Sequence, residues 1–171
     1  MRLSDALQIV VAPGLALLPE RLTSHAAVAM LLAIGLQESR FIHRRQIGGP
    51  ARGFYQFERS GGVTGVLRHS QTRDLVASVL DRLHYDHEVT TSYEAIEHND
   101  ALATVFARLL LWTVPRALPG PDDFSNAWDL YIDAWRPGKP HRATWDEFYR
   151  RAWAAGMPAK MPGGQSVRVT H

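Results

Sequence analysis

The sequence predicts a mainly α-helical single domain, and three observations support this fold class. Hydrophobic residues make up 46% of the 171 positions, which is enough for one sizeable core. Residues 26–36 and 101–112 are strongly apolar segments of helical length, as expected of helices buried in a core. No segment shows the alternation of apolar and polar residues that is typical of a half-buried strand. We expect residues 1–156 to form the domain and residues 157–171, rich in glycine, proline and basic residues, to form a tail.

The first quarter of the chain contains a short helix and then the central one. We expect Ser4 to cap a helix over residues 5–11 and the Pro-Gly pair at 13–14 to end it. The Thr-Ser pair at 23–24 offers two capping hydroxyls for the next helix, which continues to about residue 39. The apolar part of this second helix is too short to span a bilayer, which takes roughly 20 residues. It is therefore predicted to be buried inside the protein.

The remainder of the chain is predicted to alternate between helices and loops. The expected helices cover residues 63–69, 72–85, 91–97, 101–112, 124–135 and 144–155. Residues 41–52 and 115–123 are expected to be loops because of their glycine and proline content, whereas residues 54–57 are either extended or a turn. Arg108 lies within an apolar helix, where its charge costs free energy unless it is paired or reaches the surface.

The central helix ends in a carboxylate, Glu38, and this placement needs a physical explanation. A negative charge near the C-terminus of a helix is disfavoured by the helix dipole. Leu31, Ile34 and Gly35 lie one or two turns earlier on the same face, so Glu38 is expected at the rim of an apolar wall. Desolvation at such a rim raises the pKa of a carboxyl, as a general acid near neutral pH requires. The alternative interpretation is that Glu38 is only the last polar residue of its helix.

Two short motifs follow one another in this region: Glu38-Ser39 and Gly53-x-x-Gln56. Together they resemble the catalytic core of goose-type lysozymes and soluble lytic transglycosylases, with the similarity covering about residues 24–62. In that superfamily a Glu-Ser pair ends a buried helix, a Gly-x-x-Gln segment crosses beside it, and the Glu protonates the glycosidic oxygen. The resemblance implies a lysozyme-like single domain whose buried central helix ends in a catalytic Glu38, and it implies peptidoglycan glycan strands as the partner.

A second carboxylate follows the Gly-x-x-Gln motif. Glu58 stands two positions after Gln56, where goose-type lysozymes carry an acidic residue and most lytic transglycosylases do not. Inverting hydrolysis needs such a group, because a base must hold a water on the face opposite the leaving group. The resemblance thus implies a muramidase that cleaves the β-1,4 bond between N-acetylmuramic acid and N-acetylglucosamine, with Glu38 as acid and Glu58 as base. Asp129 and Asp133 are alternatives for the second carboxylate, and Glu58 as an ion-paired surface residue is the non-catalytic alternative.

Two other functions remain open. A lytic transglycosylase would use Glu38 alone, and the sugar's own hydroxyl would attack to give 1,6-anhydro products. A lysozyme-like domain without catalytic activity would only bind wall glycan or form a structural part of a phage particle. Digestion of peptidoglycan distinguishes the three functions: reducing ends indicate a hydrolase, anhydro ends a transglycosylase, and no released fragment a binding or structural protein.

The resemblance also implies supporting roles around the acid. Ser39 is expected to hydrogen-bond near Glu38 and Gln56 to face the cleft, and Gly53 leaves room for the backbone to approach a sugar. Tyr55 and Tyr131 are candidates for stacking on a pyranose ring. Tyr131 has the stronger case, because this superfamily commonly carries a cleft tyrosine on a late helix. Its local sequence, Asp-Leu-Tyr-Ile-Asp, departs from the usual Tyr-Asn-Ala-Gly.

The sequence indicates neither a metal site nor a cofactor. There is no cysteine, so disulfides, cysteine nucleophiles and cysteine metal ligands are excluded. His84 and His87 are three residues apart and Glu88 follows, but no third ligand stands at a recognisable spacing. We interpret these histidines as solvated residues near a helix end. P-loop, dinucleotide-binding and Gly-x-Ser-x-Gly motifs are also missing from the sequence.

Charge and the N-terminal residues bear on partners and location. The formal net charge is +2 and the sequence pI is near 9.2, which suits a polyanionic partner such as cell wall. There is no stripe of basic and aromatic residues, so we expect no nucleic-acid partner; we also expect a monomer without membrane insertion. Residues 1–18 are not expected to be a signal peptide, because Asp5 and a Pro-Gly pair interrupt the apolar region. The chain resembles bacteriophage products, either an endolysin that is made in the host cytoplasm and acts on the periplasmic wall, or a virion-associated wall hydrolase.

Overall fold

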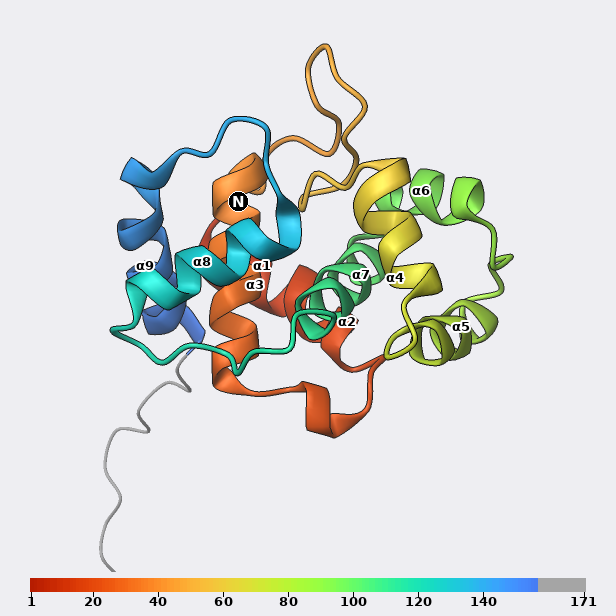
Figure 1. Cartoon of the computed structure of the whole chain (residues 1–171), viewed down its shortest axis with the longest axis horizontal. Helices are drawn as coiled ribbons and strands as arrows, with labels where there is room; N and C mark the ends of the chain where they lie inside the picture. The colour runs from red at the N-terminus through yellow and green to blue at the C-terminus, as the bar shows by residue number, and fades with distance from the viewer. Residues whose placement is uncertain (157–171) are drawn as a thin grey trace, which may run out of the picture.

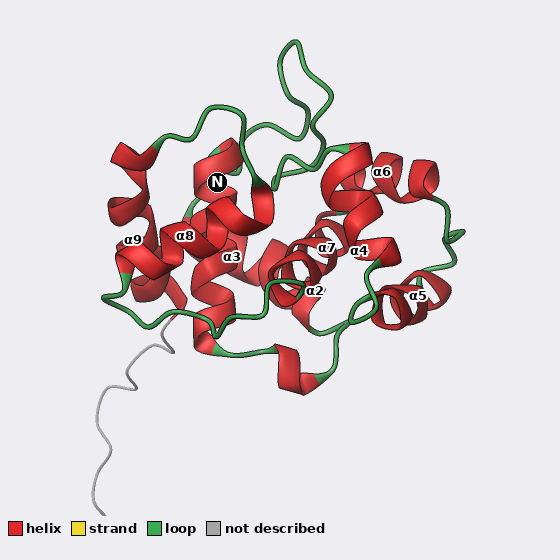
Figure 2. Cartoon of the chain, viewed as in Figure 1, coloured by secondary structure: helices red, strands yellow, loops and turns green. Residues whose placement is uncertain are grey.

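The helices of this computed structural model follow the predicted order, and the differences lie mainly at helix ends. The structure describes residues 1–156, so the predicted tail, 157–171, lies outside the described residues. Figures 1 and 2 show helices joined by loops, and no strand is present within residues 1–156. Extended pairing in this part of the chain is confined to isolated bridges between Arg45 and Arg52 and between Arg52 and Phe57. The prediction of a mainly α-helical single domain is confirmed.

The N-terminal helical segment is longer than predicted. It is made of α1 (Leu3–Ala6), a π-helical turn (Leu7–Val11) and α2 (Ala12–Leu15). Pro13 therefore does not end the segment but lies in the first turn of α2. Proline lacks the N–H that an α-helix interior uses, and the local departure from α-helical geometry at this place is the π-helical turn directly before α2.

The central helix, α3 (His25–Ser39), forms as predicted. Ser24 caps it by accepting a hydrogen bond of 3.1 Å from a backbone N–H of the first turn. Residues 29–36 are all buried, as the apolar sequence requires. Arg40, in the left-handed conformation with φ of 57°, ends the helix. In Figure 1, α3 stands between α8 and α9 on one side and α7 on the other.

The second buried helix is α7 (Asp100–Trp112). Asn99 caps it, since its side-chain oxygen accepts a hydrogen bond of 2.9 Å from the N–H of Leu102. Gly14 of α2 packs directly against α7, where an added Cβ would lie only 2.4 Å from the Cβ of Thr104. Glycine at this position therefore allows the two helices to approach closely.

The other elements surround these two helices. They are a 3₁₀ turn (Glu20–Leu22), a π-helical turn (Arg59–Val63), α4 (Thr64–Arg68), α5 (Arg73–Arg82), α6 (Val89–His98), α8 (Phe124–Trp135), a second 3₁₀ turn (Arg142–Thr144) and α9 (Trp145–Gly156). Their apolar side chains join those of α3 and α7 in one hydrophobic core. Among residues 1–156 no helix combines the length and the apolar character needed to cross a membrane.

Candidate active site

Glu38 lies on the last turn of α3 with its carboxyl half-buried. Burial raises the pKa of Glu38 to about 7, and a hydrogen bond from Tyr131 acts in the opposite direction. The Tyr131 hydroxyl donates to Oε1 of Glu38 at 2.6 Å, whereas Oε2 has no hydrogen-bond partner within residues 1–156. A carboxyl with this pKa is substantially protonated near neutral pH, so Oε2 can carry a proton that is available for donation.

Tyr131 is held in place by an aromatic cluster. Its ring stacks on Trp145, with 5.0 Å between centroids and 17° between planes, and it also contacts Trp128 and Trp135. The residue is only 2% exposed, so its ring faces have little surface to offer a sugar. Burial and the neighbouring Glu38 carboxylate raise the pKa of Tyr131, which keeps its hydroxyl a neutral donor. The structure thus places the predicted cleft tyrosine in contact with the acid, where it positions the carboxyl.

Ser39 connects the end of α3 to the turn that follows the loop. Its hydroxyl donates to the carbonyl of Phe54 at 2.7 Å and lies 3.2 Å from the carbonyl of Gly35. The same oxygen accepts a hydrogen bond of 3.2 Å from the N–H of Phe41. Ser39 is buried and has no hydrogen bond to Glu38 in the described residues. It therefore fixes the neighbouring backbone rather than contacting the acid itself.

The segment that contains Gly53 is a tight turn closed by Arg52 and Phe57. Two backbone hydrogen bonds join the closing residues, from Arg52 N–H to Phe57 C=O at 2.9 Å and from Phe57 N–H to Arg52 C=O at 2.8 Å. Gly53 has φ of +69°, and an added Cβ would lie 2.6 Å from the carbonyl oxygen of Ile96 in α6. Glycine is thus required here by the close approach of α6, which is a packing reason that the resemblance did not imply.

Gln56 and Tyr55 occupy the same turn but differ in accessibility. Gln56, half-buried with φ of +50°, donates from Nε2 to the carbonyl of Gly53 at 2.8 Å. Tyr55 has no exposed surface, and its hydroxyl lies 3.2 Å from Oγ1 of Thr104. Its carbonyl accepts a hydrogen bond of 2.9 Å from the indole of Trp135. The structure therefore places Tyr55 in the core and not at a sugar-binding surface.

Glu58 follows this turn and is exposed to solvent. Its backbone is extended, with φ of −95° and ψ of 145°, while the preceding Phe57 is buried. Within residues 1–156 no ion pair or side-chain hydrogen bond joins Glu58 to an arginine or to Glu38. Arg52, which could have formed a surface ion pair with Glu58, pairs with Glu97 instead. The Glu58 carboxylate is therefore accessible, but no direct contact couples it to the acid.

The alternative carboxylates, Asp129 and Asp133, are not brought to Glu38. Both are exposed on α8, two residues before and two residues after Tyr131. Side chains two residues apart point to nearly opposite sides of a helix, so both aspartates face away from the tyrosine that contacts the acid. Asp133 also pairs with Arg116 at 2.8 Å.

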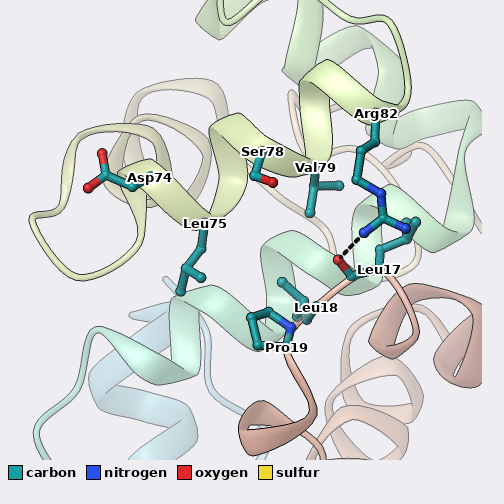
Figure 3. Close-up of a pocket in the computed structure, with 8 residues that line it drawn as sticks. All are labelled: Leu17, Leu18, Pro19, Asp74, Leu75, Ser78, Val79 and Arg82. Atoms are coloured by element: carbon teal, nitrogen blue, oxygen red, sulfur yellow. Dashed lines mark hydrogen bonds between the residues drawn. The ribbon is translucent and has the colours of Figure 1, made fainter.

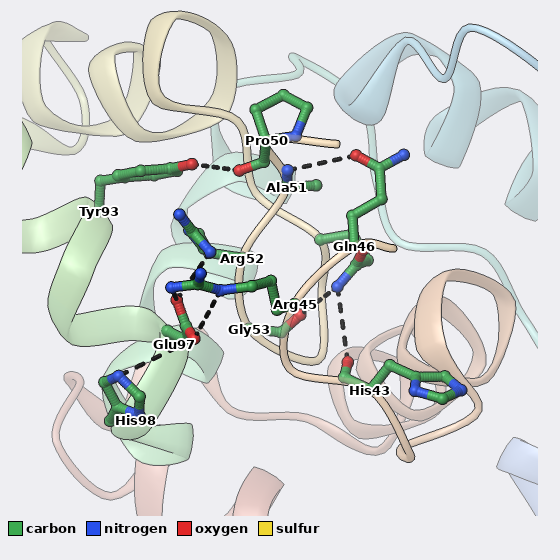
Figure 4. A network of polar contacts seen from close by, with 11 residues as sticks. His43, Arg45, Gln46, Pro50, Ala51, Arg52, Gly53, Tyr93, Glu97 and His98 are labelled. Atoms are coloured by element: carbon green, nitrogen blue, oxygen red, sulfur yellow. Dashed lines mark hydrogen bonds and ion pairs between the residues drawn. The ribbon is translucent and has the colours of Figure 1, made fainter. Parts of the chain in front are cut away.

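A network of arginines attaches the loop 43–52 to α6 (Figure 4). Arg45 makes two hydrogen bonds with the Glu97 carboxylate, of 3.0 and 3.1 Å, and Arg52 approaches the same carboxylate to 3.1 Å. The hydrogen bonds from Arg45 lower the pKa of Glu97 below its ordinary value. Arg44 makes a second two-bond pair with Asp100, at 2.9 and 2.7 Å. These ion pairs fix both ends of the loop and hold the turn that carries Gln56.

Sequence reasoning missed two residues that support the acid. Gln37, next to Glu38, donates to the carbonyl of His141 at 3.0 Å and accepts from the Thr144 hydroxyl at 3.0 Å. These bonds join the end of α3 to the loop and 3₁₀ turn that precede α9. Trp145, which stacks on Tyr131, is fully buried. The sequence contains a signal for this burial: Trp145 and the later aromatic residues of α9 recur every four residues, which predicts an aromatic face on one side of a helix.

The histidines near the end of α5 behave as ordinary polar residues. His87 lies 2.7 Å from an Asp81 carboxylate oxygen, and both side chains are exposed. His84 occupies the left-handed region with φ of 59°, just after α5. Within residues 1–156 no group of three His, Asp or Glu side chains is arranged to hold a metal ion.

Two pockets of the structure lie away from Glu38. One, of about 380 Å³, is formed by the residues after α2 and by α5, and Figure 3 shows Arg82 donating to the carbonyl of Leu17 at its edge. The other, also of about 380 Å³, lies between the start of α3 and the loop after α7. Glu38 lines neither of these two pockets.

The arrangement combines an acid, a fixed donor and an accessible carboxylate. Glu38 is a carboxyl that stays partly protonated near neutral pH, and Tyr131 orients one of its oxygens. Glu58 is exposed four residues after Phe54, whose carbonyl is bonded to Ser39. Such a set can transfer a proton to a leaving group. Comparisons of this chain with protein-family models, with curated proteins and with solved structures found no match.

Proposed function

We propose that this protein is a peptidoglycan muramidase of lysozyme-like fold, which cleaves the β-1,4 bond between N-acetylmuramic acid and N-acetylglucosamine. The observation that carries the proposal is the 2.6 Å hydrogen bond from Tyr131 to Glu38, because it orients a carboxyl whose pKa is about 7. The substrate class is supported by the resemblance of Glu38-Ser39 and Gly53-x-x-Gln56 to the goose-type lysozyme core.

The proposed reaction begins with proton transfer from Oε2 of Glu38 to the glycosidic oxygen. The bond between that oxygen and C1 of the muramic acid residue breaks, and the leaving sugar departs with the proton as a new hydroxyl. A water then attacks C1 from the opposite face, and the second carboxylate takes one of its protons. We assign this second role to Glu58, whose carboxylate is exposed and has no hydrogen-bond partner in the described residues. Proton return to Glu38 completes the cycle.

The first experiment is the substitution Glu38→Gln, assayed by the loss of turbidity of purified peptidoglycan. The amide keeps the size of the side chain but cannot donate the required proton, so activity should fall by about 10²-fold or more. Glu147→Gln on α9 is the matched control, because Glu147 is exposed and its carboxylate forms a surface ion pair with Arg151. Wild-type activity in the Glu38→Gln protein, with a normal melting temperature, would refute the assignment.

A lytic transglycosylase is the second candidate function, and one observation favours it. Two of the three candidate bases, Asp129 and Asp133, lie on the side of α8 away from Tyr131, which leaves the exposed Glu58 as the single remaining candidate. An enzyme without a working base would let the muramic acid's own hydroxyl attack C1, giving 1,6-anhydro ends. Glu58→Gln separates the two functions: a muramidase loses most hydrolysis or shifts to anhydro products, whereas a transglycosylase keeps its rate and its products.

The proposal extends to partners and location. The protein would act as a monomer on glycan strands of the cell wall, either as a phage endolysin that reaches the periplasmic wall or as a wall hydrolase carried in the phage particle. A non-catalytic glycan-binding or particle protein is the remaining alternative. Co-sedimentation of the protein with peptidoglycan, without any release of fragments, would support that alternative.

A further inference from the structure

Arg108, the one charged residue in the interior of α7, is neither paired with an acid nor exposed. The residue is 3% exposed, and its Nε donates to the carbonyl of Leu22 at 2.7 Å. Its Nη1 is buried and has no hydrogen-bond partner within residues 1–156. Desolvation lowers the pKa of this guanidinium to about 10. A buried cation without a counter-charge costs free energy, so the residue needs an explanation beyond its single backbone contact.

Arg108 lines the pocket of about 380 Å³ at the start of α3. Two other arginines line the same pocket: Arg21, which is exposed, and Arg116, which pairs with Asp133. No aspartate or glutamate is among the lining residues, so the positive charges of Arg21 and Arg108 are not balanced there. The pocket therefore has an excess of positive charge around a buried donor.

The rest of the pocket wall is largely apolar. Trp112, 37% exposed, forms part of it together with Leu111 and Leu118. The guanidinium carbon of Arg108 lies 5.2 Å from the centroid of the Trp112 ring, so charge and aromatic face are adjacent. Ser24, which also lines the pocket, already accepts the capping hydrogen bond of α3. The wall thus combines the buried Arg108 donor, beside the exposed Arg21 and Arg116, with an apolar surface.

This pocket is separate from the candidate active site. Ser24 and Glu38 stand at opposite ends of α3, and fourteen residues of helix correspond to about 20 Å. Figure 1 shows the loop after α7 passing the start of α3 and not its end.

We propose that this pocket binds a small organic anion, a carboxylate attached to a flat apolar body. The carboxylate would accept a charge-assisted hydrogen bond from the Arg108 guanidinium, whose Nε is already engaged by the carbonyl of Leu22. The apolar body would lie against Trp112 and Leu118. An organic carboxylate fits better than inorganic phosphate, because phosphate would leave the apolar wall at Trp112 and Leu118 uncovered.

Benzoate is a suitable probe, and benzamide is its neutral counterpart of the same shape. Binding would be measured by isothermal titration calorimetry, with inorganic phosphate as a third ligand. Arg108→Met removes the charge while keeping the length of the side chain. Arg82→Met is the matched control, since Arg82 also donates to a backbone carbonyl and lines a pocket of equal volume, the one in Figure 3, whose lining includes an acidic residue, Asp74.

We expect wild type and Arg82→Met to bind benzoate equally, and Arg108→Met to bind it at least tenfold more weakly. Benzamide should bind wild type at least tenfold more weakly than benzoate does, and phosphate should also bind more weakly. If Arg108→Met fails to fold, Arg21→Gln at the exposed rim supplies the test, with a loss of about threefold. The proposal is overturned if benzoate and benzamide bind alike, if phosphate binds more tightly than benzoate, if benzoate does not bind, or if the arginine substitutions leave its affinity unchanged.

Discussion

Two side chains, Glu38 and Tyr131, set the protonation chemistry of the candidate site. Burial raises the pKa of Glu38 to about 7, and the Tyr131 hydroxyl keeps it from rising further. The tyrosine itself is held by stacking on Trp145, so the oriented oxygen has a fixed position. Because this chemistry depends on the ionisation of Glu38, both the activity and the unfolding free energy of the protein should change with pH.

Tyr131→Phe tests the hydrogen bond to the acid. Loss of the donor should lower activity about tenfold, which corresponds to a hydrogen bond worth about 1.4 kcal/mol. Because the hydroxyl lowers the pKa of Glu38, its removal should move the alkaline limb of the activity profile from near pH 7 to higher pH. Tyr149→Phe, which removes a hydroxyl bonded to Pro119 in the same aromatic cluster, is the control and should leave the limb in place. An unshifted limb in Tyr131→Phe would mean that another group controls the profile.

The stability of Glu38→Gln should depend on pH relative to wild type. Below about pH 4 the carboxyl is protonated in both the folded and the unfolded protein, so its pKa shift has no effect. As pH rises through the folded pKa of about 7, wild type must ionise a half-buried carboxyl and loses stability, whereas the amide does not. The difference in unfolding free energy between variant and wild type should therefore increase from pH 4 to pH 8 by about 1–3 kcal/mol. Urea unfolding at both pH values measures it, and a constant difference would show that the carboxyl is not desolvated.

At the scale of elements, the end of α3 and the turn 53–56 act as one unit. Ser39 bonds to Phe54 across this junction, and Gln37 bonds to His141 and Thr144 on the other side. The buried helix gives the acid a rigid base, and the hydrogen bonds fix the segments around it. Disruption of the junction should therefore change activity and stability together.

Ser39→Ala removes the hydroxyl that bonds two backbone groups at this junction. The variant should lose about 1–3 kcal/mol of unfolding free energy, because the Phe54 carbonyl and the Phe41 N–H become unsatisfied. Ser24→Ala, at the other end of α3, removes the hydroxyl that caps the helix, and it should lower the unfolding free energy by about 1 kcal/mol. Activity measured well below both melting temperatures should fall in Ser39→Ala and stay near wild type in Ser24→Ala. Equal activity in the two variants would show that the junction does not position the acid.

Gly53→Ala and Gly48→Ala form a matched pair. Both glycines have positive φ, +69° and +72°, so alanine strains the backbone equally at the two positions. A Cβ at Gly53 would also lie 2.6 Å from the Ile96 carbonyl, whereas a Cβ at Gly48 meets nothing within 4 Å among the described residues. Gly53→Ala should therefore cost about 1–3 kcal/mol more than Gly48→Ala in chemical unfolding. Equal losses would contradict the close packing of α6 on this turn.

At the scale of the whole molecule, one core brings together segments that are distant in sequence. Glu38 and Tyr131 are far apart in the chain, and they meet because α8 and α9 pack beside α3 (Figure 1). On the other side, the ion pairs of Arg45 and Arg52 with Glu97 attach the loop to α6. The candidate site therefore depends on packing from both sides of the central helix.

Features governed by local sequence were predictable, and features governed by packing were not. The apolar run and its serine cap predicted α3, and the position of Glu38 at its end predicted a raised pKa. Tyr131 was predicted as a site residue, but its hydrogen bond to the acid depends on how α8 packs on α3. The local sequence around Tyr131 does not determine that packing. The continuation of the first helix past Pro13 was missed because the π-helical turn that precedes it has no sequence signature.

Mass spectrometry of the fragments released from purified peptidoglycan tests most directly whether Glu38 is the acid of a muramidase. Wild type and Glu38→Gln would be incubated in parallel with the same sacculi at pH 6, where Glu38 is largely protonated. Wild type should release muropeptides with reducing N-acetylmuramic acid ends, and Glu38→Gln should release none above background. Release of the same fragments by both proteins, or of none by wild type, would contradict the assignment of Glu38 as the catalytic acid.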